Sequence, residues 1–268
     1  MKGIAGKKFY ISVDLEGVAC AVGFPGQGLG NEKQLAFASG QGVREANAAA
    51  SALFDKGAEE VWVWDCHGTG VNLDYVSLDK RCKIVLGSGS GTRFSLIDES
   101  FGGIILIGYH AYDSIESTLS HVYSSTTYQY MKINDKKVGE LEIDLAFSGK
   151  KGVPLMLLAG DDALINQAKV NFPDAVYVET KKSLGWNMVV SKHPLTVADE
   201  IYDATLQACE ILPSLKPFTI PEPFTLECRY KRIEYAQTCG YRDQNGDRFE
   251  IVDEYTRKGV LKSIERLF

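Results

Sequence analysis

The chain has 268 residues, 45% of them hydrophobic and 24% charged, and its formal net charge is −6 at pH 7. This length is sufficient for one large domain or two modest ones with a stable core. The acidic balance argues against nucleic acid as a partner, because binding to a phosphate backbone requires clustered positive charge. No apolar run is long enough to cross a membrane and the N-terminus has no apolar signal region, so we expect a cytoplasmic protein without membrane contact.

The first part of the chain alternates short apolar runs with segments of helical periodicity. The run Phe9–Val13 is followed by a predicted helix over 32–56, which Gly57 ends. Near-continuous apolar strands separated by helices are typical of a parallel sheet covered on both faces. The predicted fold class is therefore α/β, with a mostly parallel sheet and flanking helices in Rossmann-like layering. Further apolar runs, which we expect to be buried strands, lie at 61–64, 83–86, 104–108 and 154–159.

The last part of the chain has a different pattern. Leu212–Pro223 holds four prolines, too many for a helix or a central strand. The next strand, predicted over 224–230, alternates apolar and polar residues, as half-exposed antiparallel strands do. We therefore predict two domains, a larger α/β domain over 1–190 that carries the chemistry and a smaller α+β domain over 191–268.

Acidic residues and histidines follow several of the predicted strands directly. Asp14 and Glu16 come after the first strand, His67 comes after the second, and His110 comes after the run at 104–108. The carboxyl ends of parallel strands share one edge of a sheet, where such folds bind ligands. Imidazole and carboxylate together suit zinc and its first-row neighbours. The sequence therefore predicts a metal site at this edge, with metal-assisted hydrolysis as its chemistry.

Two more candidate residues come from the middle of the chain. His121 precedes a predicted β-hairpin over 128–138, which turns at Asn134–Asp135. Glu140 opens the helix that follows the hairpin, so a rigid element can aim its carboxylate into the site. Glu142 lies two residues further on and is the alternative acid of this helix.

Other conspicuous residues have simpler explanations. The six cysteines are scattered without a CxxC pair, as reduced thiols are, and Cys66 is expected to pack in the core. His193 is expected at the surface, near a helix start. At least one of Asp161–Asp162 is expected to cap a helix, and Asp65 to orient a metal-binding imidazole. The glycine-rich segment 26–30 lacks the context of a nucleotide-binding motif and is expected to form a loop over the site.

The ordered set of motifs resembles the DppA-type D-aminopeptidases, the M55 family of zinc peptidases. Residue by residue, the resemblance implies His121 as the catalytic side chain and a site for two Zn²⁺ ions formed by Asp14, Glu16, His67, His110 and Glu140. The resemblance covers most of the chain and rests, in order, on Ser12–Gly17, Asp65–His67, Gly108–Ala111, Leu119–His121, Asn134–Asp135, Val138–Leu141 and Ala159–Asp162.

The resemblance also implies an aminopeptidase that hydrolyses short peptides with D-amino acids at the amino end. Asp14 has one oxygen to offer to each of two ions, whose hydroxide would attack the peptide carbonyl while His121 transfers a proton. By family resemblance alone we expect a homo-oligomer, a decameric ring with its sites facing an interior chamber. Two alternatives remain open at this point: a two-metal hydrolase acting on a different amide or on a phosphoester, and a non-enzymatic α/β module that binds a small ligand.

Overall fold

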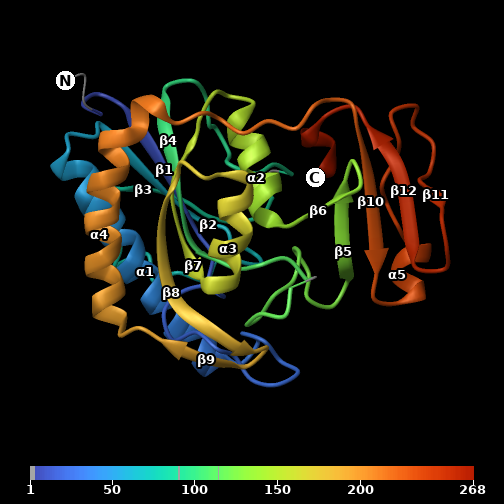
Figure 1. The fold of residues 1–268 in the computed structure, drawn as a ribbon, viewed down its shortest axis with the longest axis horizontal. Helices are drawn as coiled ribbons and strands as arrows, with labels where there is room; N and C mark the ends of the chain where they lie inside the picture. The colour runs from blue at the N-terminus through green and yellow to red at the C-terminus, as the bar shows by residue number, and fades with distance from the viewer. Residues whose placement is uncertain (1–3, 90, 114) are drawn as a thin grey trace.

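The computed structural model describes residues 4–89, 91–113 and 115–268, and its larger sheet has the strand order β3-β2-β1-β4-β7-β8-β9 (Figure 1). Neighbouring strands are parallel except β8 and β9, which are antiparallel. The predicted parallel sheet is therefore confirmed, and its order is that of doubly wound Rossmann-like folds. Its strands are β1 (Lys8–Val13), β2 (Glu60–Asp65), β3 (Lys83–Val85), β4 (Phe101–Tyr109), β7 (Leu155–Asp161), β8 (Val176–Gly185) and β9 (Met188–Ser191).

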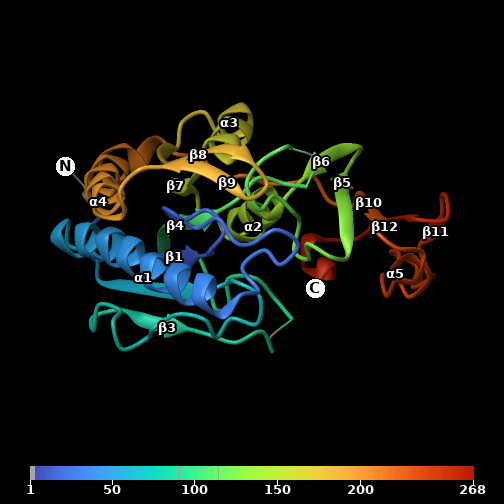
Figure 2. The same cartoon turned by 90° about the horizontal axis from the view of Figure 1, so that it is seen from below.

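Alternation of side chains along β1 divides the core into two layers. Phe9, Ile11 and Val13 belong to the layer that contains the buried faces of α1 and α4, whereas Tyr10 belongs to the layer that contains α2 and α3. In Figure 2, α1 and α4 accordingly lie on one side of β1 and β4, and α2 lies on the other. Helices on both faces confirm the predicted layering. The helices are α1 (Glu32–Asp55), α2 (Glu140–Gly149), α3 (Asp162–Asn171) and α4 (Pro194–Ile211).

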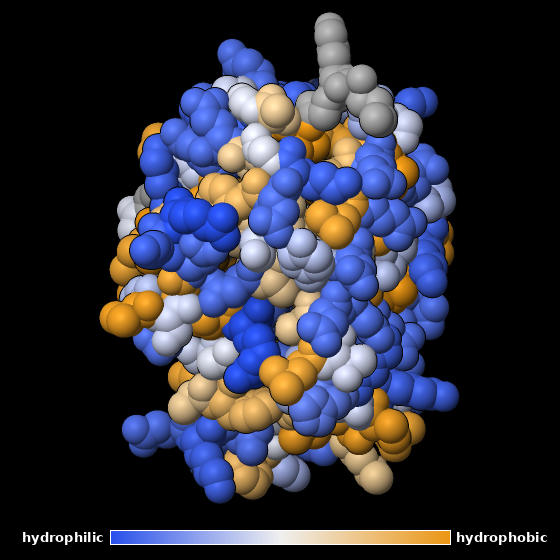
Figure 3. All heavy atoms as spheres, turned by 90° about the vertical axis from the view of Figure 1, so that its left-hand side faces the viewer, coloured by the Kyte–Doolittle hydropathy of each residue, from blue (hydrophilic) through white to orange (hydrophobic). Residues whose placement is uncertain are grey.

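Polar contacts join α1 and α4 on the outer surface. Lys56 Nζ lies 3.2 Å from Glu210 Oε1, and the Tyr202 hydroxyl donates to Asp55 at 2.7 Å. Figure 3 views this side of the molecule and shows hydrophilic side chains over much of it, with apolar ones between them. Exposed ion pairs contribute little to stability, so the buried apolar faces of the two helices hold them to the sheet. In the part of the chain that the structure describes, no helix is both long and apolar enough to cross a membrane.

The prediction of a buried strand at 83–86 is wrong. β3 has only three residues and lies at the edge of the sheet, paired with β2 alone. Ile84 is 37% exposed and Leu86 is 52% exposed. An apolar run does not distinguish a central strand from an edge strand, because the position of a strand depends on its neighbours in space.

A second, antiparallel sheet in the order β11-β12-β10-β5-β6 lies to the right in Figure 1. The predicted hairpin is confirmed, since Asn134 and Asp135 connect β5 to β6 with φ angles of 49° and 63°, as a two-residue hairpin turn requires. The remaining strands of this sheet come from the end of the chain. The elements are β5 (Tyr128–Ile133), β6 (Lys136–Val138), β10 (Phe224–Tyr230), β11 (Glu250–Ile251) and β12 (Thr256–Leu261), with α5 (Ile233–Gln237) and the 3₁₀ turns η1 (Leu212–Ser214) and η2 (Ile264–Leu267).

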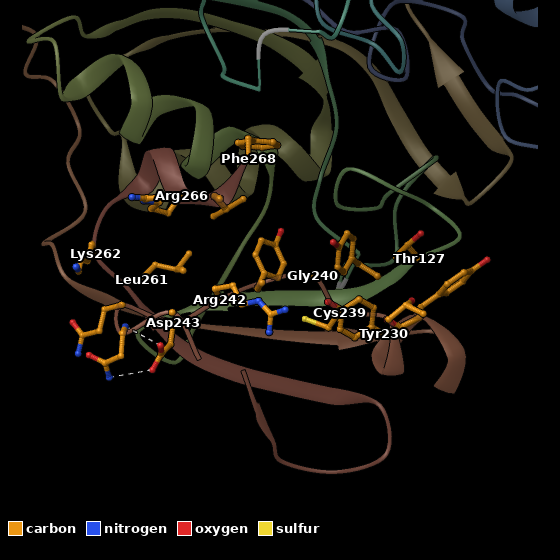
Figure 4. Close-up of a pocket in the computed structure, with 18 residues that line it drawn as sticks. Thr127, Tyr230, Cys239, Gly240, Arg242, Asp243, Leu261, Lys262, Arg266 and Phe268 are labelled. Carbon is orange, nitrogen blue, oxygen red and sulfur yellow. Dashed lines mark hydrogen bonds between the residues drawn. The ribbon is translucent and has the colours of Figure 1, made fainter. Parts of the chain in front are cut away.

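The division of the chain between the two sheets does not follow the predicted boundary at residue 190. β5 and β6 belong to the smaller sheet although they precede residue 190, and α4 packs on α1 and β8 of the larger layer although it follows that residue. Sheet membership does not decide which segments fold independently, so the division into domains at residue 190 stays a prediction. The smaller sheet borders a cavity of about 750 Å³ lined by residues such as Tyr230, Arg242 and Phe268, and none of the six candidate site residues lines it (Figure 4).

The segment that follows β1 touches the end of β4 where the strand order of the larger sheet reverses. Gly17 N donates to Gly108 O at 2.7 Å, and Asp14 N donates to Ile107 O at 2.8 Å. Gly108 has a φ of 70°, and a Cβ at this position would overlap the carbonyl oxygen of Asp14. Glycine at 108 therefore permits the close approach that brings the acidic segment against the end of β4.

We expect Gly108→Ala to lower the free energy of unfolding by about 2–4 kcal/mol, because the added methyl group forces both a strained φ and a steric overlap. Gly40→Ala is the matched control, since Gly40 is exposed in α1 and a Cβ there meets no atom within 4 Å. The control should leave stability unchanged or raise it by up to about 1 kcal/mol. Chemical denaturation measures both, and equal stability of the two variants would contradict the packing argument.

Candidate metal centre

The structure brings all six candidate residues of the sequence to one site at the carboxyl edge of the larger sheet. Asp14 and Glu16 follow β1, His67 follows β2 and His110 follows β4, on either side of the point where the strand order reverses. Such a point is where open α/β sheets bind ligands. Glu140 is the first residue of α2, and His121 lies in the loop between β4 and β5. A cavity of about 430 Å³ is lined by five of the six, and His110 is buried behind it.

Asp14 stands between two groups of candidate ligands. Its Oδ1 lies 3.0 Å from His67 Nδ1, which is also 3.1 Å from Glu16 Oε2. Its Oδ2 lies 3.5 Å from His110 Nε2, which is 3.3 Å from Glu140 Oε1. The two oxygens of one carboxylate thus face two separate imidazoles, and each imidazole has a second carboxylate beside it.

Three carboxylates are buried together in this centre. Asp14, Glu16 and Glu140 are 3%, 5% and 8% exposed, and no lysine or arginine of the described residues forms an ion pair with any of them. Burial and the neighbouring Glu16 carboxylate raise the pKa of Asp14 to about 7. Burial would also raise the pKa of Glu140, but the adjacent His110 imidazole, 3.3 Å away, holds it at about 2. Buried carboxylates at this density require compensating positive charge, which the neighbouring imidazoles or a metal ion can supply.

The bonding of His110 supports the presence of a cation. Its Nδ1 lies 3.0 Å from the carbonyl oxygen of Ala111, which can only accept, so Nδ1 carries a proton. Its buried Nε2 has no hydrogen-bond partner among the described residues, although two carboxylate oxygens lie within 3.5 Å. Burial lowers the pKa of His110, but the adjacent Glu140 and Asp14 carboxylates raise it to about 10, so this position favours positive charge. If a metal ion supplied that charge, a neutral ring with its proton on Nδ1 would offer the Nε2 lone pair as a ligand, as metal-binding histidines do.

The candidate ligand atoms are close enough to share ions. Asp14, Glu16 and His110 form one set, and His110, His121 and Glu140 form another; within each set one ligand atom per residue lies within 4.8 Å of the others. Nitrogen and oxygen donors in these numbers suit zinc and neighbouring divalent metals. The residues present therefore fit a metal centre.

His121 is held in one tautomer beside this centre. Its Nδ1 donates to the carbonyl oxygen of Leu119 at 2.7 Å, and its ring stacks on His110 at 4.1 Å with an angle of 13° between the planes. Its Nε2 lies 4.0 Å from Glu140 Oε1. Burial and the adjacent His110 lower the pKa of His121. The ring is therefore neutral near pH 7, and Nε2 is its proton acceptor.

Several secondary predictions are resolved by hydrogen bonds. Glu142 accepts from Gly139 N at 2.8 Å and from Gln167 Nε2 at 2.9 Å, so it caps α2 and does not join the centre. Asp161 caps α3, as predicted, by accepting from Leu164 N. His193 is exposed and caps α4. Burial raises the pKa of Cys66 well above its usual range, so this core residue is no thiolate.

The prediction for Asp65 is correct only indirectly. Asp65 accepts from the backbone and side-chain nitrogens of Asn72, and Asn72 Nδ2 donates to the carbonyl oxygen of His67 at 2.6 Å. The aspartate therefore positions the backbone of a candidate ligand through an intermediary and does not contact the imidazole. The loop Gln27–Gly30 borders the cavity, as expected for a segment over the site.

Lys181 is a supporting residue that the sequence does not reveal. It is 1% exposed on β8, and its ammonium donates to the carbonyl oxygens of Glu16, Val18 and Ala21. Burial lowers its pKa to about 8, so near pH 7 it still carries the three protons that match these three acceptors. Thr180 Oγ1 also donates to the carbonyl oxygen of Gly17 at 2.6 Å. β8 thus fixes the loop that presents Glu16, although nothing in the sequence distinguishes Lys181 from Lys182.

Imidazoles and carboxylates gathered at the strand ends of a doubly wound α/β sheet are typical of enzymes that bind a metal there. Comparison with known proteins identifies the family. The Peptidase M55 model, described as D-aminopeptidase, matches residues 7–261. The chain belongs to this family and is a peptidase, which confirms the predicted enzyme class and sets aside the non-enzymatic alternative.

Two comparisons with Bacillus subtilis proteins agree with this assignment. A D-aminopeptidase of strain 168 is 27% identical over 235 residues, covering 86% of this chain and 84% of that protein. The solved structure of Zn-dependent D-aminopeptidase DppA, a self-compartmentalizing protease, is similar with a TM-score of 0.84 and 25% identity, covering 97% of this chain and 93% of that one. The likeness extends over both sheets.

We expect Lys181→Met to lower the free energy of unfolding by about 2–4 kcal/mol, because three buried carbonyl groups lose their donor while the volume is nearly conserved. Lys182→Met is the matched control, since Lys182 is the next residue of the same strand and is exposed. Denaturant unfolding of the two variants compares them directly. A loss of the same size in both would show that the buried ammonium has no special role.

Proposed function

We propose that this protein is a zinc-dependent aminopeptidase that removes D-amino acids from the amino end of short peptides. The observation that carries the proposal is the convergence of three buried carboxylates on His110, whose Nε2 has no hydrogen-bond partner among the described residues, in a member of the D-aminopeptidase family. The zinc dependence of the similar Bacillus subtilis structure supports the choice of metal. We assign two ions per chain to Asp14, Glu16, His67, His110 and Glu140, which would hold them.

Bound zinc would act as a Lewis acid on the scissile carbonyl and lower the pKa of a water molecule. The chain itself holds the ligands rigidly. The backbone nitrogen of Tyr123 donates to Glu140 Oε1 at 2.9 Å, and Lys181 fixes the loop of Glu16. Rigid ligands reduce the reorganisation that the reaction requires.

His121 is the residue that we assign to proton transfer. Its Nδ1 is committed to the carbonyl oxygen of Leu119, and its lowered pKa keeps Nε2 unprotonated near neutral pH. Nε2 can therefore accept a proton from the attacking water and return it to the leaving amine. In this assignment His121 carries the proton, and the five other candidate residues bind the metal ions.

The cavity restricts the substrate. Its volume of about 430 Å³ lies at the lower end of the range for small-molecule sites, and Trp186 and the loop Gln27–Gly30 form part of its wall. A cavity of this size fits a short peptide and excludes a folded protein. We further propose a homo-oligomer, with a decameric ring as the predicted form, and the self-compartmentalizing relative supports this.

The first test is elemental analysis of protein purified without chelator or metal-affinity resin, followed by an assay with D-alanyl and L-alanyl dipeptides. We expect close to two zinc ions per chain and cleavage of the D-alanyl substrate. Glu140→Gln should lose metal and activity, whereas Glu142→Gln, its matched control on the same helix, should keep both. Metal-free protein after reconstitution with zinc would refute the proposal.

We expect His121→Ala to reduce kcat by roughly 100- to 10,000-fold, the usual contribution of a general acid–base group, with zinc content near that of the wild type. His193→Ala serves as the control, because His193 is exposed and caps α4. The zinc content decides between two roles. If His121→Ala loses metal as His110→Ala does, His121 is a ligand of the second set and the proton-transfer role is wrong.

A further inference from the structure

Arg93 is the sole lysine or arginine among the described residues that line the cavity of the metal centre. The lining carboxylates Asp14, Glu16 and Glu140 are assigned to the proposed metal ions, so Arg93 is the cationic side chain of this wall that can face a negatively charged part of a substrate. Arg93 comes from the loop between β3 and β4, and its side-chain hydrogen bonds go to Asp144, which is not one of the candidate ligands. Its place in the wall therefore calls for a separate explanation.

The guanidinium of Arg93 is fixed before any substrate arrives. Its Nε lies 2.7 Å from Asp144 Oδ1 and its Nη2 lies 2.8 Å from Asp144 Oδ2, and Asp144 is fully buried on α2. The group also packs 4.4 Å from the ring centre of Trp64 and 5.5 Å from that of Tyr123. Its Nη1 has no hydrogen-bond partner among the described residues, and the side chain retains 11% exposure. The Nε edge of the guanidinium is thus occupied by Asp144, whereas Nη1 keeps its N–H groups unpaired among the described residues.

Arg93 is connected to the metal centre through Tyr123. Tyr123, on whose ring it packs, donates its backbone nitrogen to Glu140 Oε1 at 2.9 Å. In a dipeptide the terminal carboxylate is separated from the scissile carbonyl by a single residue, a span of about 3.8 Å between successive Cα atoms. A cation that recognises this carboxylate must therefore border the metal centre, as Arg93 does.

We propose that Arg93 binds the C-terminal carboxylate of the substrate and so makes the enzyme selective for dipeptides with a free carboxyl end. This inference rests on the proposed aminopeptidase function. Arginine presents paired N–H donors that match a carboxylate, and a fixed guanidinium loses little entropy on binding. The metal centre would act on the first peptide bond while Arg93 binds the terminal carboxylate. Only a peptide in which these two groups are one residue apart can occupy both positions.

The test compares a D-alanyl dipeptide with the same dipeptide carrying a C-terminal amide. The zinc-loaded wild type should prefer the free carboxylate by about 10- to 100-fold in kcat/KM, mostly through KM, as expected for one charge-assisted contact. Arg93→Lys, and the double variant Arg93→Met with Asp144→Asn, should reduce this ratio toward one. Both should keep kcat/KM for the amide within about twofold, with unchanged zinc content. The double variant avoids leaving Asp144 buried without its partner.

Arg81→Lys is the matched control. Arg81 also pairs through Nε and Nη2 with an aspartate, Asp79, and packs 4.3 Å from the ring centre of Phe54, but it does not line the cavity. It should leave both substrates unaffected. A wild type that cleaves both dipeptides equally, or Arg93 variants that lose both activities in parallel, would overturn the role of Arg93 alone. A zinc-loaded wild type that cleaves neither would overturn the proposed aminopeptidase function itself.

Discussion

Burial of three carboxylates at one edge of a parallel sheet is the constraint on which the rest of this structure depends. Asp14, Glu16 and Glu140 are nearly inaccessible to water, and two imidazoles lie between them. Negative charge in a poorly solvated site is costly unless a cation or hydrogen-bond donors compensate it. The candidate centre therefore needs compensating positive charge, and the proposed metal ions would supply it and would also stabilise the loops that carry their ligands.

The fold meets this constraint with backbone contacts and a few buried polar side chains. Gly108 allows the segment after β1 to touch the end of β4, and Lys181 satisfies three carbonyl groups of the same segment from β8. Arg93 is fixed by Asp144 in a similar way on the opposite layer. In each case a charged or conformationally special residue supports a neighbour, so rigidity is distributed around the centre and does not depend on the metal ligands alone.

Much of the fold and the candidate site could be predicted from local pattern. Apolar periodicity predicted β1, α1 and the hairpin at Asn134, because side-chain alternation and turn conformation are properties of a few consecutive residues. Strand ends predicted that Asp14 and His110 would meet, since parallel strands align their carboxyl ends. The same reasoning failed for 83–86, where an edge position leaves an apolar run exposed. Neither the support by Lys181 nor the exposure of Ile84 has a local signature.

The sequence by itself determined the types of residue that follow each strand and therefore the chemistry available at the sheet edge. Tertiary structure alone decided how these residues divide their contacts: one oxygen of Asp14 toward His67 and the other toward His110, Glu140 toward the centre and Glu142 away from it. It also decided that Arg93 enters the cavity wall. The physical reason is that periodicity and capping act over one or two turns of chain, whereas these contacts join segments dozens of residues apart whose distances are set only when the sheet and its helices pack.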